Sequence, residues 1–493
     1  MRMGFRRLLV VLLAVLGLAV PGVAVAAPQP TTVVSLTFDD GDADQVMAAD
    51  ILAAHRMPAT YYIISGAVGS PGYLTLDQIR HLAAQGNEIG GHTVSHLDLT
   101  QVSLAEARRQ VCQSRQILTD WGFRVTSFAY PDGSANADLH AVVRECGYSS
   151  ARLDGGLLSP TCDGCAPAGA FRPPDPYGLP TAEQVDMSWT VADLQRVVTN
   201  AERTGGWVPL VFHHVCDTSV CGPLSIRTDT LRAFADWLAD RGNTQVKTVD
   251  QVIGGTVAPV VRSAAAAPHG VVNGSLETVG AFDASESDTG PAPAHPTVPR
   301  CWSETGYGDN STTWRHVRGG HAGTWAERIT MTKHRSGDAK LLPRFDLGEC
   351  APTAAPGTGY QLSAWYHGSV RTQFAVYYRE PSGRWVYWTT SPFFAPSDTW
   401  AQASWRTPAL PADGSAVSFG LAVAQVGTLT TDDYRITPVE PAAAAAAAGG
   451  GVSLSLTAGL FLAGALVVAA LYFVRPRRRQ MALARSDPSS SNR

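Results

Sequence analysis

The sequence has little charge for its length, and the charge that it has is not of the kind that binds polyanions. Only 16% of the 493 residues are charged. Of the 38 Lys and Arg residues, nine lie in the first 27 or the last 19 positions, which leaves 29 basic against 41 acidic residues between these ends. A nucleic-acid-binding protein has the opposite balance. Gly and Pro follow no regular period, and 45% of the residues are hydrophobic, so collagen-like and disordered chains are excluded.

Two apolar segments near the ends of the chain predict its sorting. Residues 1–27 have a basic start, an apolar run and small residues around Ala26, which is the pattern of a secretory signal peptide. An uncleaved anchor is the alternative. Residues 452–474 are uncharged, apolar and numerous enough to cross a bilayer as a helix, and the Arg-rich residues 475–493 predict a cytoplasmic tail. We therefore expect a single-pass protein of the cell membrane with its main domains extracellular. A buried core helix is the alternative for the second segment.

The eight cysteines agree with export, because their number is even and all lie in the part expected outside the cell. Cys301 and Cys350 are expected to form a disulfide, since no other cysteine lies in that half of the chain. Four others have spacings that also suit zinc ligands, although disulfides are favoured in an oxidising compartment. These four are Cys162, Cys165, Cys216 and Cys221.

The pattern of apolar residues divides the chain into two domains. In residues 31–255, short apolar runs alternate with helical patterns, which predicts a parallel sheet covered by helices, an α/β layer or barrel. An Ala- and Pro-containing linker follows at 256–270. Residues 271–438 contain eight of the twelve tryptophans and no helical periodicity, which predicts a β-sandwich or jelly roll. Residues 439–451 form an Ala- and Gly-rich stalk before the apolar segment.

Local patterns give the expected elements of both domains. Helices are predicted to begin at capping boxes, which are Thr75–Gln78, Ser103–Glu106 and Thr248–Gln251. Strands of the first domain are predicted at Val33–Phe38, Ala59–Ile64, Glu88–Gly91, Ser127–Ala129 and Trp207–Phe212. Strands of the second domain are predicted at Tyr360–Trp365, Gln373–Tyr378, Arg384–Trp388 and Ala416–Val423.

Polar motifs follow four of the predicted strands, at the sheet edge where α/β folds keep their functional sites. The motifs are TFDDG (37–41), HTVSH (92–96), FAYPDG (128–133) and VFHH (211–214). We expect His92 and His96 to meet on one side of a helical turn, because residues four apart are neighbours there, and to share a metal ion.

This order of motifs resembles the polysaccharide deacetylase family, the NodB-homology carbohydrate esterases, over about residues 33–254. The resemblance implies a distorted (β/α) barrel that removes acetyl groups from sugar polymers with a divalent metal. By position, Asp39 resembles the general base and His213 the general acid, a role that passes to His214 if the strand alternation is shifted by one residue. The residues that resemble the metal ligands are Asp40, His92 and His96.

One carboxylate and two imidazoles with open positions are typical of a catalytic metal site. Zinc is favoured by these ligands, and cobalt, nickel or manganese also fit. The reaction oxyanion is expected to lie against the metal and a backbone N–H of the turn at Asp132. The chain departs from the family pattern at two positions. Many family members have an aromatic residue where this chain has Asp132, and an arginine, which holds the base, where it has Ala129. Arg152 or Arg172 is expected to replace that arginine, and another group that holds the base is the alternative.

The second domain resembles a carbohydrate-binding module of the galactose-binding-like jelly-roll type. The resembling pieces are Asn273–Glu277, His321–Trp325, Gly359–Trp365 and Asp432–Tyr434. By this resemblance, Glu277 and Asp433 are candidate ligands of a structural calcium ion. Candidate sugar-binding rings are Trp314, Tyr387 and Trp388.

The sequence as a whole predicts a cell-surface, metal-dependent hydrolase of carbon–nitrogen bonds other than peptide bonds, which deacetylates a polysaccharide at its N-acetyl groups. The alternative is a catalytically weak or inactive glycan-binding surface protein that kept the barrel. The expected partners are an acetylated glycan and, through one span, the membrane, with no nucleic acid. O-acetyl groups are the alternative to N-acetyl groups, and the polymers that fit are peptidoglycan, chitin-like oligomers, exopolysaccharide and acetylated xylan.

Overall fold

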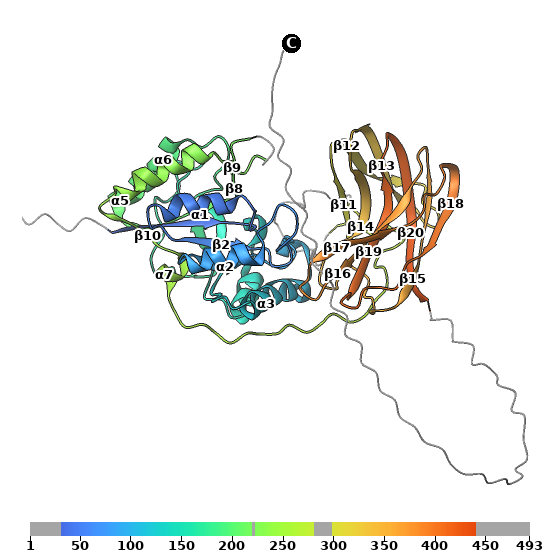
Figure 1. Cartoon of the computed structure of the whole chain (residues 1–493), viewed down its shortest axis with the longest axis horizontal. Helices are drawn as coiled ribbons and strands as arrows, with labels where there is room; N and C mark the ends of the chain where they lie inside the picture. The colour runs from blue at the N-terminus through green and yellow to red at the C-terminus, as the bar shows by residue number, and fades with distance from the viewer. Residues whose placement is uncertain (1–30, 219–221, 281–297, 440–493) are drawn as a thin grey trace, which may run out of the picture. The chain divides into compact units, whose positions relative to one another are not determined.

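A computed structural model describes residues 31–218, 222–280 and 298–439, which form an α/β domain and an all-β domain (Figure 1). The predicted signal peptide (1–27) and membrane segment (452–474) lie outside the described residues, as do the tail and all but the first residue of the stalk. Among the described residues, none of the helices is both long enough and apolar enough to cross a membrane.

The first domain contains a curled parallel sheet with β1 at its centre. Strand β1 pairs with β7 along its whole length, and its two halves pair with β10 and β2. From β2 the sheet continues in order to β6. A bridge between Gln184 and Val211 links the chain after β6 to β7. The strands are β1 (Thr32–Phe38), β2 (Ala59–Ile63), β3 (Glu88–Gly91), β4 (Ser127–Ala129), β5 (Ser150–Gly156), β6 (Leu179–Thr181), β7 (Gly206–Phe212) and β10 (Thr244–Val246).

The parallel, curled sheet confirms the predicted barrel-like α/β fold. All seven residues of β1 are buried, as expected for a strand whose two faces are covered. A short sheet of β8 (His214–Val215) and β9 (Ser225–Ile226) lies after β7. The helices are α1 (Gln45–Ala53), α2 (Leu76–Ala84), α3 (Leu104–Asp120), α4 (Ala137–Glu145), α5 (Val191–Thr204), α6 (Thr228–Ala239) and α7 (Val249–Ile253), with 3₁₀ turns η1 (Leu99–Gln101) and η2 (Pro131–Gly133).

Two of the three predicted capping boxes are complete, at Thr75 and at Thr248. The third is half formed. The Ser103 side chain accepts from the Glu106 N–H, but the Glu106 carboxylate does not return to the Ser103 N–H. That N–H donates to Glu349 of the second domain instead, at 3.1 Å.

The second domain is a sandwich of two antiparallel five-stranded sheets in the described residues, in the orders β11-β14-β19-β16-β17 and β12-β13-β20-β15-β18. Apolar side chains from both sheets form its core. This agrees with the predicted all-β domain. The strands are β11 (Trp302–Tyr307), β12 (Asn310–Arg318), β13 (Trp325–His334), β14 (Asp338–Pro343), β15 (Gly359–Gly368), β16 (Gln373–Arg379), β17 (Trp385–Thr390), β18 (Ser397–Arg406), β19 (Ala416–Val423) and β20 (Gly427–Val439).

The cysteines form disulfides rather than a zinc site. The predicted Cys301–Cys350 bond is present. Cys162 and Cys165 bond to each other and Cys216 is also disulfide-bonded, which excludes the four-thiolate zinc site. A further disulfide, Cys112–Cys146, joins α3 to the end of α4.

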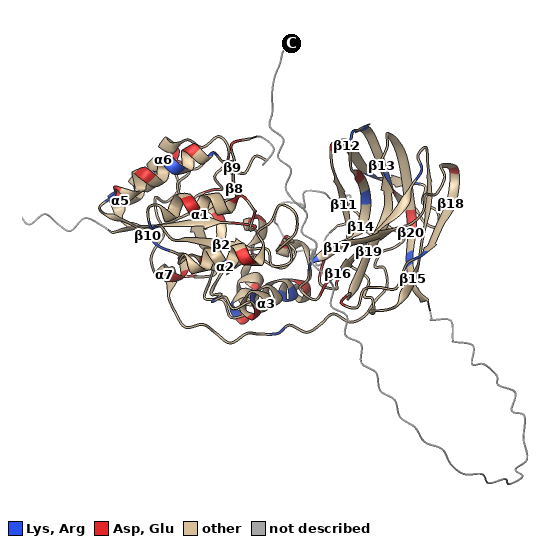
Figure 2. Cartoon of the chain, viewed as in Figure 1, with Lys and Arg blue, Asp and Glu red and all other residues tan. Residues whose placement is uncertain are grey.

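Basic and acidic positions are interspersed on the helices of the first domain rather than segregated by sign (Figure 2). Helix α3 shows both, with Glu106 next to Arg108 and Arg109. The described parts of both domains belong to one compact unit.

Candidate active site

The two adjacent aspartates that follow β1 separate into different surroundings. Asp39 is 4% exposed and forms an ion pair with Arg152 of β5, which is itself buried and lies over the Tyr62 ring. Burial alone would raise the pKa of Asp39, but the charges of Arg152, His92 and His213 outweigh it and lower this pKa. Asp39 is therefore held as a buried carboxylate. Of the two arginines offered by the sequence, Arg152 is the one at this position.

Asp40 turns away from Asp39 toward two imidazoles. Its φ of 71° places it in the left-handed region, and its Oδ1 lies 3.4 Å from His92 Nε2 and 3.3 Å from His96 Nε2. Burial opposes ionisation of Asp40, but His92 and His96 beside it lower its pKa. The three side chains form a group whose candidate ligand atoms all lie within 4.8 Å of one another.

This donor set fits a divalent metal. Within the described residues, Asp40 Oδ1 is buried and has no partner with hydrogen-bond geometry. His92 Nδ1 lies 2.8 Å from the Ala129 carbonyl, which fixes the proton on Nδ1 and leaves Nε2 to face Asp40. Metal-binding histidines usually have such a hydrogen bond from the ring nitrogen that does not face the metal. Ala129, which stands where many members of the resembling family have an arginine, thus contributes its carbonyl to the site.

The two histidines meet through a loop, so the predicted helical turn is wrong. Residues 92–96 have no helical structure, and Thr93 and His96 both have positive φ, at 63° and 53°. The N–H of His96 donates to Thr93 Oγ1 at 2.9 Å, which closes the loop. The rings of His92 and His96 come to 4.8 Å between centroids.

Of the two adjacent histidines after β7, His213 faces the aspartates. Its Nε2 lies 4.0 Å from Asp39 Oδ2, and the residue is 8% exposed. Burial lowers the pKa of His213, while the charges of Asp39 and Asp40 oppose this shift. His214 points elsewhere, with its Nδ1 at 2.9 Å from Asp44. The shifted register, with His214 in the site, therefore does not occur.

A buried glutamine that the sequence did not reveal joins the two catalytic candidates. Gln45 of α1 is fully buried, and its Nε2 donates to the backbone carbonyls of Asp39 and, at 3.2 Å, of His213. It fixes the ends of β1 and β7 relative to each other. Only its position six residues after Asp39 could have indicated it.

The turn at Asp132 lies in η2, and this residue has a φ of 56°. The N–H of Gly133 donates to the Tyr130 carbonyl, so it is not available to a ligand. The Asp132 side chain is exposed, and its charge acts on His96, where it opposes the pKa-lowering effect of burial. This places the turn beside the metal-candidate group.

The predicted calcium ligands lie in the second domain and are already engaged. Glu277 Oε1 accepts from the N–H groups of Thr324 and Trp325, and Asp433 Oδ2 lies 2.7 Å from His321 Nδ1. Neither belongs to a group of three or more candidate ligands among the described residues. The calcium site stays a prediction.

The candidate sugar-binding rings divide by burial. Trp314 and Trp388 pack against the core of the second domain, whereas Tyr387 is 54% exposed.

A second group of candidate ligands, Asp346, Glu349 and Cys350, is structural. The Cys350 sulfur is bonded to Cys301 and offers no thiolate. The Asp346 carboxylate accepts the N–H groups of Gly348, Cys350 and Ala351.

The Arg152–Asp39 pair gives the first testable prediction. We expect Arg152→Met to lower the free energy of unfolding by about 3–5 kcal/mol, because it leaves the buried Asp39 carboxylate without its cation. The exposed Arg172 is the matched control, and Arg172→Met should change the value by less than about 0.5 kcal/mol. Urea unfolding of the metal-free protein measures both. The double variant Arg152→Met/Asp39→Asn should recover part of the loss. Equal free energies of unfolding for Arg152→Met and Arg172→Met would contradict the assignment.

Comparison with known proteins shows which family the first part of the chain matches. Residues 26–151 match the family model described as polysaccharide deacetylase, a segment that includes the first three of the four motifs. The resemblance indicated by those motifs is thereby confirmed for this part of the chain.

Three curated relatives illustrate the match. A chitooligosaccharide deacetylase of Sinorhizobium fredii is 36% identical over 17% of this chain and 39% of its own length. A peptidoglycan-N-acetylglucosamine deacetylase of Bacillus cereus is 26% identical over 25% and 57%, respectively. The peptidoglycan-N-acetylmuramic acid deacetylase PdaC of Bacillus subtilis is 33% identical over 23% and 24%. The chain thus spans between about a quarter and three fifths of the length of these relatives.

Two solved structures align more loosely. The structure titled T48 deacetylase with substrate is 20% identical, with a TM-score of 0.32, over 47% of this chain and 95% of its own. A family 11 carbohydrate-binding module of Clostridium thermocellum is 10% identical, with a TM-score of 0.22, over 28% and 88%. Scores this low assign no function to either domain.

Proposed function

We propose that the first domain is a divalent-metal-dependent deacetylase of an acetylated polysaccharide, acting on N-acetyl groups. One observation carries the proposal. The Asp40, His92 and His96 group lies next to a buried carboxylate, Asp39, and a buried imidazole, His213, on the sheet edge where the strands end. The family match and the deacetylase names of the relatives support the same reaction.

Asp40, His92 and His96 would hold the metal, most readily zinc, with cobalt, nickel or manganese as alternatives. When bound, such an ion supplies Lewis acidity to an acetyl carbonyl and to water. Asp40 follows the end of β1, and His92 and His96 follow the end of β3.

Asp39 acts as the general base in this proposal. It takes a proton from the attacking water as the oxygen adds to the acetyl carbon. Its ion pair with Arg152 keeps the carboxylate charged and oriented, and Gln45 fixes its backbone. The lowered pKa of Asp39 supports the ionised form that a base requires before the reaction.

His213 acts as the general acid. The step requires its protonated form, which burial disfavours and the charges of Asp39 and Asp40 favour. In that form it donates a proton to the amine nitrogen as the C–N bond breaks, so that acetate and a free amine leave. We assign the backbone N–H of Asp132 the role of donor to the developing oxyanion, a role that such donors have in acyl transfer. The effect of the Asp132 charge on the pKa of His96 supports a place near the metal-candidate group.

We also propose an extracellular location for both domains and a glycan-binding role for the second domain. We infer from residues 1–27 and 452–474 that the two domains are held outside the cell by one membrane span. The second domain would bind glycan, for which the exposed Tyr387 is one candidate contact.

Acetate release from a panel of substrates tests the reaction. The purified chain is incubated with N-acetylglucosamine oligomers, peptidoglycan and O-acetylated xylan, and free acetate is measured enzymatically. We expect release from at least one N-acetylated glycan. Retention of the chain on a polymer without acetate release from any substrate would contradict the proposal and favour the glycan-binding alternative.

A further inference from the structure

The loop that carries both metal-binding histidines is backed by the second domain. Val94 is the middle residue of this loop, 92–96, and it is fully buried. It packs in one apolar cluster with Ile117 of α3 and with Leu347, which lies in the loop after β14. Gly383, in the turn between β16 and β17, also lies directly against the Val94 side chain. A Cβ atom added to this glycine would come within 2.3 Å of Val94 Cγ1.

A chain of hydrogen bonds connects the same elements. The N–H groups of Val94 and Ser95 both donate to Gln110 Oε1, at 3.1 and 3.0 Å. Gln110 Nε2 donates to Glu106 Oε1 at 2.9 Å, and the same oxygen accepts from the Leu347 N–H at 2.8 Å. Glu106 and Gln110 are both fully buried.

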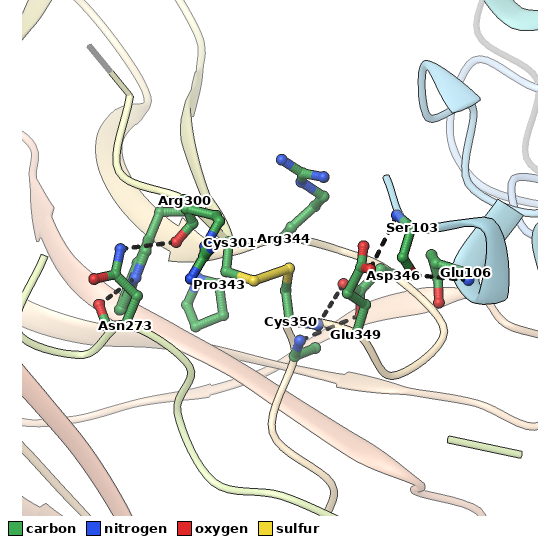
Figure 3. The surroundings of a disulfide bond; sticks show 12 residues. Ser103, Glu106, Asn273, Arg300, Cys301, Pro343, Arg344, Asp346, Glu349 and Cys350 are labelled. Carbon is green, nitrogen blue, oxygen red and sulfur yellow. Dashed lines mark hydrogen bonds between the residues drawn. A yellow bond between two sulfur atoms is a disulfide. The ribbon is translucent and has the colours of Figure 1, made fainter. Parts of the chain in front are cut away.

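The half-formed capping box explains why Glu106 is available. Figure 3 shows Ser103 and Glu106 at the start of α3 next to Asp346 and Glu349 of the second domain. Because Glu349 accepts from the Ser103 N–H, the Glu106 carboxylate is not needed for its usual capping role. It reaches the Leu347 N–H instead.

The loop needs such support, because its own conformation is unfavourable. Thr93 and His96 both have positive φ, which costs of order 1–3 kcal/mol for each residue and persists only where the surroundings enforce it. Gln110 satisfies two N–H groups of this loop, and Val94 fixes its centre from the inside.

We propose that the second domain holds the metal-binding loop in its ligating shape, with Gln110, Glu106 and Leu347 as positioning residues. This inference rests on the proposed metal site. In this proposal the second domain stabilises the conformation of the metal-binding loop, whereas a tethered glycan-binding module would only bind the polymer. None of the three residues belongs to the Asp40, His92 and His96 group.

Zinc affinity of the full chain, measured by competition with a chromophoric chelator, tests the proposal. We expect Gln110→Ala and Leu347→Ala to weaken zinc binding by about 10- to 100-fold, as changes in the support of metal ligands do. Glu106→Ala should act in the same direction. Glu106→Gln, which keeps an oxygen for the Leu347 and Gln110 donors, should stay within about threefold of the original chain.

Arg344→Ala is the matched control, because it removes a hydrogen bond between the same two domains, from Arg344 to the Gln101 carbonyl, that involves neither Glu106 nor Gln110. It should change zinc affinity by less than about threefold. Circular dichroism identifies any variant that fails to fold. Unchanged zinc affinity in folded Gln110→Ala and Leu347→Ala, with tight binding by the original chain, would overturn the positioning proposal alone. An original chain that binds no divalent metal would overturn the metal site itself.

Discussion

Asp39→Asn is expected to lower kcat for deacetylation by about 10²- to 10⁴-fold, the usual contribution of a positioned general base. The amide has nearly the shape of the carboxylate but cannot accept the proton of the attacking water. Metal binding should persist, because Asp39 faces Arg152 and His213 rather than the Asp40, His92 and His96 group. Steady-state rates and metal content by mass spectrometry measure the two properties on one sample.

Asp39→Asn also leaves the buried Arg152 charge without a partner, which could unfold the site. The control is Arg152→Met/Asp39→Asn, where both charges are gone. If the missing base causes the defect, the double variant regains stability but not activity. Retained activity in folded Asp39→Asn would show that another group is the base.

Asp40→Ala is expected to remove the metal itself. We expect zinc affinity to fall by more than about 100-fold, because changes of residues that only support the metal ligands already lower metal affinity by about 10–100-fold. Activity should disappear with the metal. Asp44→Asn is the matched control, since Asp44 pairs with His214 and lies outside the metal-candidate group. Equal zinc content of Asp40→Ala and the original chain would contradict the ligand assignment.

The strands and the sheet edge were predictable from the sequence for a physical reason. A parallel strand covered on both faces is mostly apolar, so β1 and β7 appear as short apolar runs with sharp ends, whereas β3 begins with the buried Glu88. The polar residues that follow each run then lie at one edge. The sequence therefore predicted that Asp39, Asp40, His92 and His213 lie close together.

What the sequence did not predict depends on contacts between distant residues. The helical turn expected for residues 92–96 is wrong because Gln110 and Val94 hold a different backbone shape there. The sequence offered both Arg152 and Arg172 to Asp39, and only the pairing of β4 with β5 selects Arg152. The capping box at Ser103 failed because its N–H is taken by Glu349, 246 residues further along the chain.

Acetate release by the purified chain before and after metal removal tests the central claim most directly. The account predicts that a chelator abolishes release from an N-acetylated glycan and that added zinc, cobalt, nickel or manganese restores it. The same metals should restore nothing in Asp40→Ala. Acetate release that continues at its full rate in metal-free protein would contradict a metal-dependent deacetylase at Asp40, His92 and His96.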